Sequence, residues 1–320
     1  MSEPLRICIA GAGAFGVKHI EALSAIDGAV VTTLVGRDAG RTAEVGARFG
    51  IGDTSTDFAA TIARKDIDAV ILCTPTGVHA AQGLACLAAG KHVQIEIPIA
   101  DNLADAQALL DAQRASGGLV GMAGHTRRFN PSHQWIHRKV AARELTIQHL
   151  VAQTFFFRRT NTNALGEPRS WTDHLLWHHA CHTVDLFAYQ TGEHVTLARA
   201  IEGPPHPVLG IAMDMSIQMK ARSGALCTLA LSFNNNGPLG TTFRYICDNG
   251  TFVASYDDLT DHNGKAVDVS RVDVSMNGIE LQDRAFVEAI RTGRQAPSSF
   301  ESVLPAYVTL DRLAHSLNEV

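Results

Sequence analysis

The amino-acid sequence predicts an N-terminal α/β domain built on a parallel sheet, residues 1–124, and a C-terminal α+β domain with an open, mostly antiparallel sheet, residues 125–320. Strand-like and helix-like segments alternate as far as residue 124, which is typical of a parallel sheet with helices on both faces. Beyond that point several strand-like segments follow one another, joined by turns such as Ser223-Gly224 and Asn249-Gly250. The sequence leaves open whether the last helices pack back on the first domain.

The N-terminal segments follow from short apolar runs and from helical spacing of apolar residues. Ala69–Cys73 is apolar throughout, and the Ala/Leu-rich helix that follows ends at Gly90. The predicted strands are 6–10, 30–35, 69–73, 92–95 and 119–123, and the predicted helices are 15–26, 41–49, 57–64, 80–89 and 103–116. The segment between residues 50 and 56 is predicted as a loop.

The C-terminal domain is predicted in the same way. Its strands are expected at 145–158, 195–201, 211–220, 225–233, 242–247 and 251–256, and its helices at 135–143, 171–190, 281–291 and 302–317. Most of these strands are consecutive, so an antiparallel arrangement is the simplest one.

Three glycines, Gly11, Gly13 and Gly16, follow the first predicted strand in the spacing G-x-G-x-x-G. A strand before them and a helix after them are the context that a dinucleotide-binding Rossmann fold requires. Gly11 permits the tight turn, Gly13 lets the backbone approach a pyrophosphate, and Gly16 lets the helix pack close to the sheet. The alternative is a glycine-rich turn without a ligand.

The end of the second predicted strand indicates which dinucleotide binds. Gly36 leaves room there, and Arg37 can make charge-assisted hydrogen bonds to the 2′-phosphate of NADP. The alternative is that Asp38 binds the ribose hydroxyls of NAD and Arg37 is solvated. We therefore predict NADP, with NAD as the second choice. The predicted cofactor residues are Gly11, Gly13, Ala14, Phe15, Gly16, Gly36, Arg37, Arg41, Cys73, Thr74, Pro75, His79 and Glu96.

Composition excludes several classes of protein. The chain has 320 residues and a formal charge of −5, and its arginines occur in pairs rather than in long basic runs, which argues against a nucleic-acid partner. No apolar stretch is long enough to span a membrane, and no secretory signal is recognisable. The six cysteines are far apart and contain no C-x-x-C. We expect a cytoplasmic protein with neither a nucleic-acid nor a membrane partner.

The motifs together resemble the glucose–fructose oxidoreductase / inositol dehydrogenase superfamily over nearly the whole chain. The matching segments are the glycine motif, Thr74-Pro75-x-x-x-His79, Arg127-Arg128-Phe129-Asn130-Pro131 and His182-x-x-Asp185. The resemblance implies a Rossmann domain followed by an open antiparallel sheet whose free face commonly forms a homodimer. It implies that His79 shapes the nicotinamide pocket and that Glu96 orients ribose or nicotinamide, with a plain surface carboxylate as the alternative for Glu96.

Two departures narrow the resemblance. The superfamily usually has Glu-Lys-Pro where this chain has Glu96-Ile97-Pro98, and usually has an aspartate where this chain has His178. The detailed pattern is similar to one branch, the 4-carboxy-2-hydroxymuconate-6-semialdehyde dehydrogenases of protocatechuate degradation. Membership would imply oxidation of the cyclic hemiacetal of that semialdehyde to 2-pyrone-4,6-dicarboxylate with NADP⁺. The segments that carry this similarity are 94–99, 124–134, 156–161, 170–179, 182–190 and 275–284.

A dicarboxylate substrate needs local cations in a protein whose net charge is negative. Arginine suits this role because its planar fork can bond both oxygens of a carboxylate. The predicted substrate-binding residues are Arg127, Arg128, Arg158 and Arg169. Arg158 and Arg159 point to opposite faces of an extended segment, so only one of them is expected to reach the substrate. The alternative is that these arginines form structural ion pairs or a subunit contact.

Oxidation of a hemiacetal also requires a proton acceptor, and histidine can serve near neutral pH. His178 and His182 are four residues apart and therefore share a helical face. We predict that one of them is the base, with His179 third, and that Asp185 orients His182. The alternatives are a buried structural pair of His182 with Asp185, and a zinc site, which the lack of further ligands disfavours; we predict no metal.

Two other functions stay open at this stage. One is oxidation of a polyol or sugar, which the absence of the lysine and the excess of arginine disfavour. The other is a non-catalytic NADP-binding sensor, which would bind cofactor without turning over a substrate.

Overall fold

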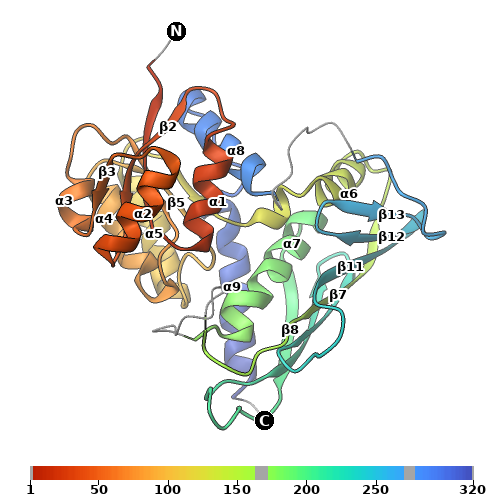
Figure 1. Ribbon diagram of the computed structural model, residues 1–320. Coiled ribbons are helices and arrows are strands. Elements are labelled where there is room, and N and C mark those ends of the chain that lie inside the picture. Colours follow the sequence, from red (N-terminus) through yellow and green to blue (C-terminus); the bar gives the residue numbers. More distant parts are fainter. Residues whose placement is uncertain (1–2, 163–171, 270–277, 319–320) are drawn as a thin grey trace. The chain divides into compact units, whose positions relative to one another are not determined.

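The computed structural model describes residues 3–162, 172–269 and 278–318 of the chain. The chain divides into two compact units (Figure 1), one of residues 1–125 with 274–304 and the other of residues 126–273 with 305–320. Helix α9, Phe300–Ser316, begins in the first unit and continues in the second from Pro305.

The first unit contains a six-stranded parallel sheet in the order β3-β2-β1-β4-β5-β6. Its strands are β1 (Leu5–Ala10), β2 (Ala29–Val35), β3 (Asp53–Ser55), β4 (Ala69–Leu72), β5 (His92–Ile95) and β6 (Gly121–Ala123). The predicted Rossmann fold is confirmed. The prediction of a loop at residues 50–56 is wrong for β3, because pairing with the edge of β2 outweighs the low strand propensity of its polar residues.

The helices of this unit are α1 (Ala14–Leu23), α2 (Ala39–Phe49), α3 (Phe58–Ile62), α4 (His79–Ala88), α5 (Leu103–Ala115) and α8 (Ile279–Thr292). From β1 the strand order runs outward through β2, and from β4 it runs the other way through β5. Right-handed crossovers therefore place α1 and α4 on opposite faces of the sheet. Helix α8 lies beside α1 (Figure 1), so a late segment of the chain completes the first unit.

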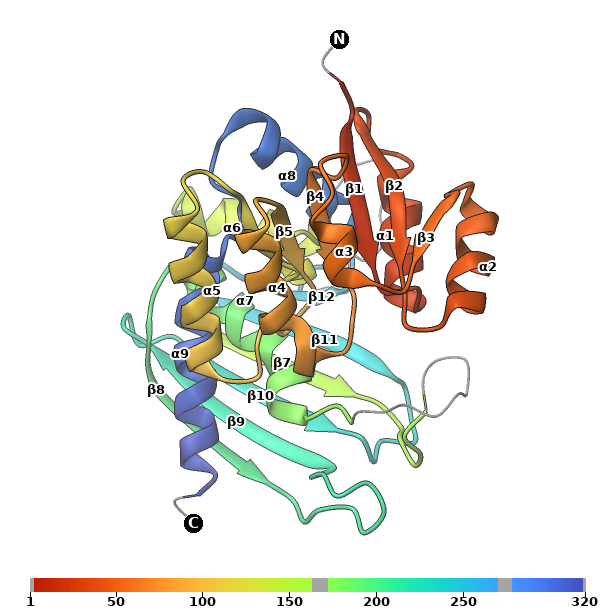
Figure 2. The ribbon, with the colours of Figure 1, turned by 90° about the vertical axis from the view of Figure 1, so that its left-hand side faces the viewer.

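The second unit contains a seven-stranded sheet in the order β13-β12-β11-β7-β10-β9-β8 (Figure 2). Its strands are β7 (Ile147–Phe155), β8 (Val195–Glu202), β9 (Asp214–Ala221), β10 (Leu226–Ser232), β11 (Gly240–Cys247), β12 (Gly250–Ser255) and β13 (Asp258–Thr260). Every neighbouring pair is antiparallel except β7 with β10. The predicted mostly antiparallel sheet is confirmed.

Burial alternates along these strands, so one face of the sheet is covered and the other is open. Helices α6 (Pro131–Ala141) and α7 (Cys181–Thr191) pack on the covered face. On the open face, Leu197, Lys220 and Leu226 form one exposed row across β8, β9 and β10. Formation of a homodimer through this face stays a prediction.

Helix α7 is preceded by a π-helical turn, Leu175–Ala180. The sequence predicted one regular helix over 171–190. Residue 171 lies outside the described residues, residues 172–174 are not helical, and the regular helix begins only at Cys181, after the π-helical turn. A π-turn is a rare insertion that frequently occurs at functional sites, and apolar periodicity cannot reveal it. In the part of the chain that the structure describes, no helix is both long and apolar enough to cross a membrane.

Candidate active site

The turn between β1 and α1 contains three glycines, and the surroundings of each one explain why a larger side chain is absent. A Cβ on Gly11, whose φ is +123°, would lie 2.5 Å from the carbonyl oxygen of Cys73, and a Cβ on Gly16 would lie 1.8 Å from that of Gly11. A Cβ on Gly13 would meet nothing within 4 Å. Gly11 and Gly16 are therefore required by packing, whereas the space beside Gly13 is open and fits a pyrophosphate at the start of α1.

The first residues of α1 lie next to the open space beside Gly13. Gly13 is the N-cap and provides no side-chain hydrogen bond to the helix, so its first amide groups are available to an anion. Ala14 and Phe15 open the helix, and the Phe15 ring is half exposed with the Lys18 ammonium 5.1 Å from its centroid. The residues present fit a bound dinucleotide.

The structure at the end of β2 differs from the prediction that Gly36 leaves room for a ligand. A Cβ on Gly36 would lie 2.1 Å from Oγ1 of Thr42 and 3.3 Å from the Ala12 Cβ. The room at Gly36 is thus occupied by the protein itself rather than kept for a ligand. Asp38 caps α2, because its Oδ1 accepts the Arg41 backbone N–H at 2.8 Å. Arg37 is exposed beside this helix start.

His79 joins two loops at the carboxyl edge of the sheet. Its Nε2 lies 2.7 Å from the Thr74 carbonyl oxygen after β4, and its Nδ1 lies 2.8 Å from the Pro98 carbonyl oxygen after β5. The ring is buried, and burial lowers its pKa. A neutral imidazole can donate to only one of these two acceptors at a time. His79 therefore fixes the shape of the edge, while Pro75 between the two loops is exposed.

Glu96 follows β5 and belongs to a buried ionic cluster, so the alternative of a plain surface carboxylate is wrong. Its Oε1 lies 3.2 Å from Nε2 of His19 on α1 and accepts from Nε2 of Gln282 at 3.3 Å. The other ring nitrogen of His19 lies 2.8 Å from Oδ2 of Asp283 on α8, and Gln94 donates to Asp283 Oδ1 at 2.7 Å. His19 and Asp283 have no exposed surface.

The His19 ring is held as a cation in this cluster. Burial alone would lower the pKa of His19, but the neighbouring Asp283 carboxylate outweighs that effect and raises the pKa well above its usual value. Burial also raises the pKa of the nearby Cys73 thiol. Sequence reasoning missed His19 and Asp283. The only available signals were a histidine on the apolar face of α1 and an aspartate in the unusual segment 275–284.

In the second unit, the first arginine of the Arg127-Arg128 pair is the less engaged one. Its guanidinium lies over the Tyr256 ring, 4.9 Å from the centroid, and its Nη1 donates to Asn130 Oδ1 at 3.4 Å. No carboxylate of the described residues lies within ion-pair distance of Arg127. Burial lowers the pKa of this arginine, which marks a charge that is short of partners.

Arg128 is in the opposite situation. Its Nε and Nη2 donate to the two oxygens of Asp185 at 2.7 and 2.5 Å, and both side chains are buried. The guanidinium also lies 4.7 Å from the centroid of the Tyr189 ring. This bidentate ion pair joins the 3-10 turn Thr126–Arg128, which precedes α6, to α7. The sequence did not suggest Arg128 as the partner of Asp185, and orientation of His182 by Asp185 stays a prediction.

Arg158 lies in a third cluster, with Asp173 and His179. Its Nη2 donates to Asp173 Oδ2 at 2.5 Å, whereas its Nη1 is buried and has no hydrogen-bond partner among the described residues. His179 Nε2 lies 3.5 Å from the same Asp173 oxygen, and Phe233 packs against both His179 and Arg158. Arg159 is exposed and lies over Phe157, as an extended segment requires. Arg169, also predicted to bind substrate, lies outside the described residues.

His178 in the π-helical turn has its tautomer fixed by the backbone. Its Nδ1 accepts the His174 N–H at 2.9 Å, so the ring proton of neutral His178 must be on Nε2. Burial lowers the pKa of His178 to about 4. The ring can therefore donate from Nε2 more readily than it can accept a proton. His182 lies in the first turn of α7 with a partly exposed ring.

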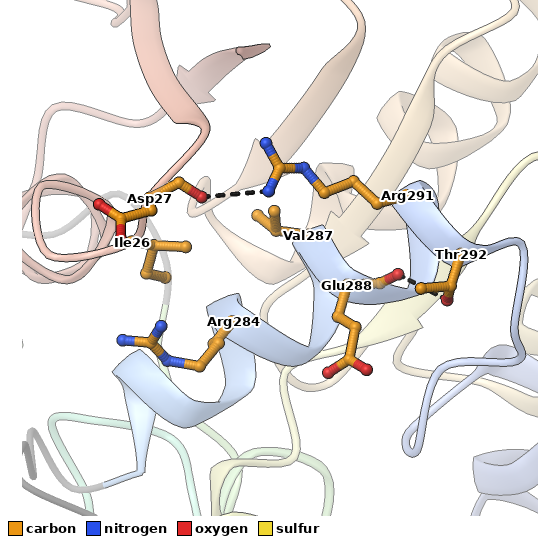
Figure 3. Close-up of a pocket in the computed structure, with 7 residues that line it drawn as sticks. All are labelled: Ile26, Asp27, Arg284, Val287, Glu288, Arg291 and Thr292. Atoms are coloured by element: carbon orange, nitrogen blue, oxygen red, sulfur yellow. Dashed lines mark hydrogen bonds between the residues drawn. The ribbon is translucent and has the colours of Figure 1, made fainter. Parts of the chain in front are cut away.

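An open pocket in the first unit does not belong to these sites. It lies between α8 and the segment before β2 and is lined by Ile26, Asp27, Arg284, Val287, Glu288, Arg291 and Thr292 (Figure 3). Arg291 donates to the carbonyl oxygens of Asp27 and Gly28 there. This end of β2 is opposite the end that meets the glycine turn, so the pocket is remote from the cofactor residues. Among the described residues, no group of three or more His, Cys, Asp or Glu side chains is arranged to hold a metal ion.

Known proteins resemble this chain over its whole length. Residues 5–124 match the model of an oxidoreductase family with an NAD-binding Rossmann fold, and residues 131–273 match that of bacterial oxidoreductases, C-terminal. A 4-carboxy-2-hydroxymuconate-6-semialdehyde dehydrogenase of Sphingobium sp. is 60% identical over 315 residues, which are 98% of this chain and 99% of that protein.

More distant relatives share the architecture. An inositol 2-dehydrogenase of Acidothermus cellulolyticus is 30% identical over 77% of this chain and 72% of its own. The solved structure of a levoglucosan dehydrogenase in complex with NADH has a TM-score of 0.88 at 20% identity, and covers 99% of this chain and 98% of its own. That likeness shows the fold, whereas the closer relatives show the family. The chain belongs to the NAD-binding Rossmann-fold oxidoreductase family that includes the inositol dehydrogenases, and it is an NAD(P)-dependent oxidoreductase.

Proposed function

We propose that the protein oxidises the cyclic hemiacetal of 4-carboxy-2-hydroxymuconate-6-semialdehyde to 2-pyrone-4,6-dicarboxylate with NADP⁺, in the cleavage pathway of protocatechuate. The observation that carries the proposal is the identity of 60% with a dehydrogenase of that name over 98% of this chain. The buried, incompletely paired arginines of the second unit support it, because a dicarboxylate is the kind of substrate that they would bind.

The first unit would bind the dinucleotide, whose nicotinamide supplies the hydride acceptor. The open space at Gly13 and the uncapped start of α1 would receive the pyrophosphate. Arg37 and Arg41 would bind the 2′-phosphate. Asp38 supports this choice of NADP over NAD, because one oxygen of its carboxylate is already used to cap α2.

Two arginines of the second unit would hold the two carboxylates of the substrate. Arg127 has no carboxylate partner among the described residues, and Arg158 has one buried nitrogen without a hydrogen-bond partner. Arg128 would act differently from Arg127 and Arg158, because its guanidinium already donates hydrogen bonds to both oxygens of Asp185. Its role in the proposal is to hold the neighbouring Arg127 in place. Binding by Arg169 stays a prediction.

His182 would accept the hydroxyl proton of the hemiacetal. The fixed tautomer of His178 supports this choice, because Nδ1 of that ring is already an acceptor and Nε2 carries the proton. His178 would then donate a hydrogen bond to a substrate oxygen from Nε2. His179 stays the third candidate, and its Nε2 lies 3.5 Å from Oδ2 of Asp173.

The test is nicotinamide reduction by the purified protein, with NADP⁺ and NAD⁺ in parallel. The substrate is the product of 4,5-cleavage of protocatechuate, generated in place, and pyrone formation is followed by chromatography. Rapid reduction with NADP⁺ supports the whole proposal. Reduction with NAD⁺ alone would keep the reaction and contradict the assignment of Arg37.

Oxidation of a polyol is the second candidate, and the similarity to inositol 2-dehydrogenases favours it. Myo-inositol is therefore assayed beside the semialdehyde. Turnover of inositol without turnover of the semialdehyde would replace the proposal. Cofactor binding without turnover of either substrate would point to a sensor instead.

A further inference from the structure

The cluster around His19 has a geometry that suits a doubly protonated ring, because each ring nitrogen lies within hydrogen-bond distance of a carboxyl oxygen. Both neighbours of the ring are carboxylates, Asp283 at Nδ1 and Glu96 at Nε2, and a carboxylate can only accept. The cluster thus has two anionic groups and one cation, with Gln94 and Gln282 as neutral donors. The Cys73 thiol is the remaining titratable group that faces His19.

His79 shows that this arrangement is not simply a property of buried histidines. Both rings lie in the first unit, and both have an oxygen near each nitrogen. The oxygens near His79 are backbone carbonyls, and burial lowers its pKa; the oxygens near His19 are carboxylates, and its pKa is raised. The charge on the partners makes the difference.

Glu96 is the member of the cluster that reaches the cofactor edge. It directly follows β5, in the half of the sheet beyond β1 and β4, and ligands bind outside the carboxyl ends of such strands. The β1–α1 turn holds the pyrophosphate in this fold, so the strands β4 to β6 serve the nicotinamide half of the dinucleotide. Glu96 also retains 11% exposure of its side chain, whereas His19 and Asp283 retain none.

We propose that His19, which is held by Asp283, is a positioning residue that fixes the side chain of Glu96 at the nicotinamide side of the site, so that the unit binds the oxidised, cationic dinucleotide in preference to the reduced, neutral one. The role rests on the NAD-binding fold and not on the identity of the substrate. A bias of this kind suits an enzyme that works in the direction of oxidation.

The test measures dissociation constants of NADP⁺ and NADPH for the full-length protein without substrate, from pH 6 to pH 8, by calorimetry. The quantity of interest is the ratio of the two constants. Titration of the 2′-phosphate affects both ligands equally and cancels in the ratio, and the same ratio can be taken with NAD⁺ and NADH. The variants are Glu96→Gln, His19→Gln and, as a matched control, His92→Gln, whose ring accepts the Val120 N–H elsewhere in the same unit.

Glu96→Gln is expected to shift the ratio toward the reduced dinucleotide at every pH, by on the order of tenfold for one partly screened charge. His19→Gln leaves two buried carboxylates without a cation, and such a pair takes up a proton as the pH falls. Near pH 8 its ratio should favour the oxidised dinucleotide more strongly than the wild-type ratio does, because the cation is gone, and the ratio should drift toward the reduced form as the pH falls to 6. His92→Gln should leave the ratio unchanged.

A ratio in Glu96→Gln that equals the wild-type ratio would overturn the proposal, even if His19→Gln does not fold. A ratio in a folded His19→Gln that does not depend on pH would reduce His19 to a purely structural residue. Failure of the proposed hemiacetal oxidation would leave these binding ratios unaffected, so the two ideas are tested separately.

Discussion

The two units pair their buried and partly buried charges differently. In the first unit, the cationic ring of His19 lies between the carboxyl groups of Glu96 and Asp283. In the second unit, the arginines at positions 128 and 158 each pair with one aspartate, whereas the arginine at position 127 has no carboxylate within ion-pair distance among the described residues, and Asp257 acts on it from farther away. The overall formal charge of −5 reveals neither arrangement.

This difference shows that the ion pairs between neighbouring side chains, rather than the net charge of the protein, determine the charge of the ligand that a buried cluster can bind. A charge left over in a site of low dielectric attracts an opposite charge more strongly than a surface charge does. On this basis we propose that the first cluster favours a cationic nicotinamide and that the arginines of the second unit favour a dicarboxylate. Within the second unit the same contrast recurs between Arg128, which is fully paired, and Arg127, which is not.

The largest expected effect concerns the proposed proton acceptor. Replacement of His182 by Asn should lower kcat by roughly 10²–10⁴-fold, the usual contribution of a general base. His178→Asn should cost less, because the proposal makes that ring a donor rather than an acceptor. Initial rates of nicotinamide reduction measure both, with the exposed His262→Asn as control. Near-normal turnover by His182→Asn would transfer the role to His179.

Arg128, which forms the ion pair with Asp185, should have the largest effect on the free energy of unfolding. Arg128→Met leaves Asp185 buried without its partner, and the free energy of unfolding should fall by about 3–5 kcal/mol. The double variant Arg128→Met with Asp185→Leu should recover much of that loss, because neither charge then remains unpaired. Urea denaturation measures all three proteins. If the single variant were as stable as the wild type, the ion pair would be absent in solution.

Arg127, which has no carboxylate partner among the described residues, should matter most for substrate binding. Arg127→Gln should raise KM by roughly 10–100-fold, the value of a charge-assisted hydrogen bond to a carboxylate. Its free energy of unfolding should change much less than that of Arg128→Met, because no carboxylate of the described residues loses a partner. An unchanged KM together with a large loss of stability would reverse the contrast between the two arginines.

The smallest expected effect concerns cofactor choice. Arg37→Ala should weaken NADP⁺ about tenfold, since it removes one exposed contact to the 2′-phosphate, and should leave NAD⁺ binding unchanged. Arg48→Ala on the same α2 helix is the matched control, because that arginine pairs with Glu21 instead. Equal weakening of both dinucleotides would show that Arg37 supports the fold of the turn rather than the phosphate.

Much of the first unit could be predicted because its signals are local. The three glycines, the alternation of strands and helices, and the strand ends at Thr74 and Glu96 are all visible within short stretches of sequence. The prediction failed at β3, where pairing with a neighbouring strand overrides local propensity, and at the π-helical turn, which no periodicity reveals.

The ionic clusters could not be predicted because their members are distant in sequence. His19 and Asp283 are 264 positions apart, and Arg128 and Asp185 are 57 apart. Pattern reasoning paired Asp185 with its helical neighbour His182, whereas the structure shows both its oxygens bonded to an arginine from another helix. It also ranked the four predicted substrate arginines alike, since only the folded chain shows which of them already have partners.

The return of α8 to the first unit has a consequence for the order in which the protein matures. While the chain is being synthesised, residues 1–125 leave the ribosome long before Asp283 does, so for most of that time His19 has one carboxylate neighbour instead of two. A nascent or excised N-terminal segment would therefore lack Asp283, one of the two carboxyl groups that contact His19. The cofactor unit can be completed only after α8 has been made, and a functional dinucleotide-binding fragment would have to include α8.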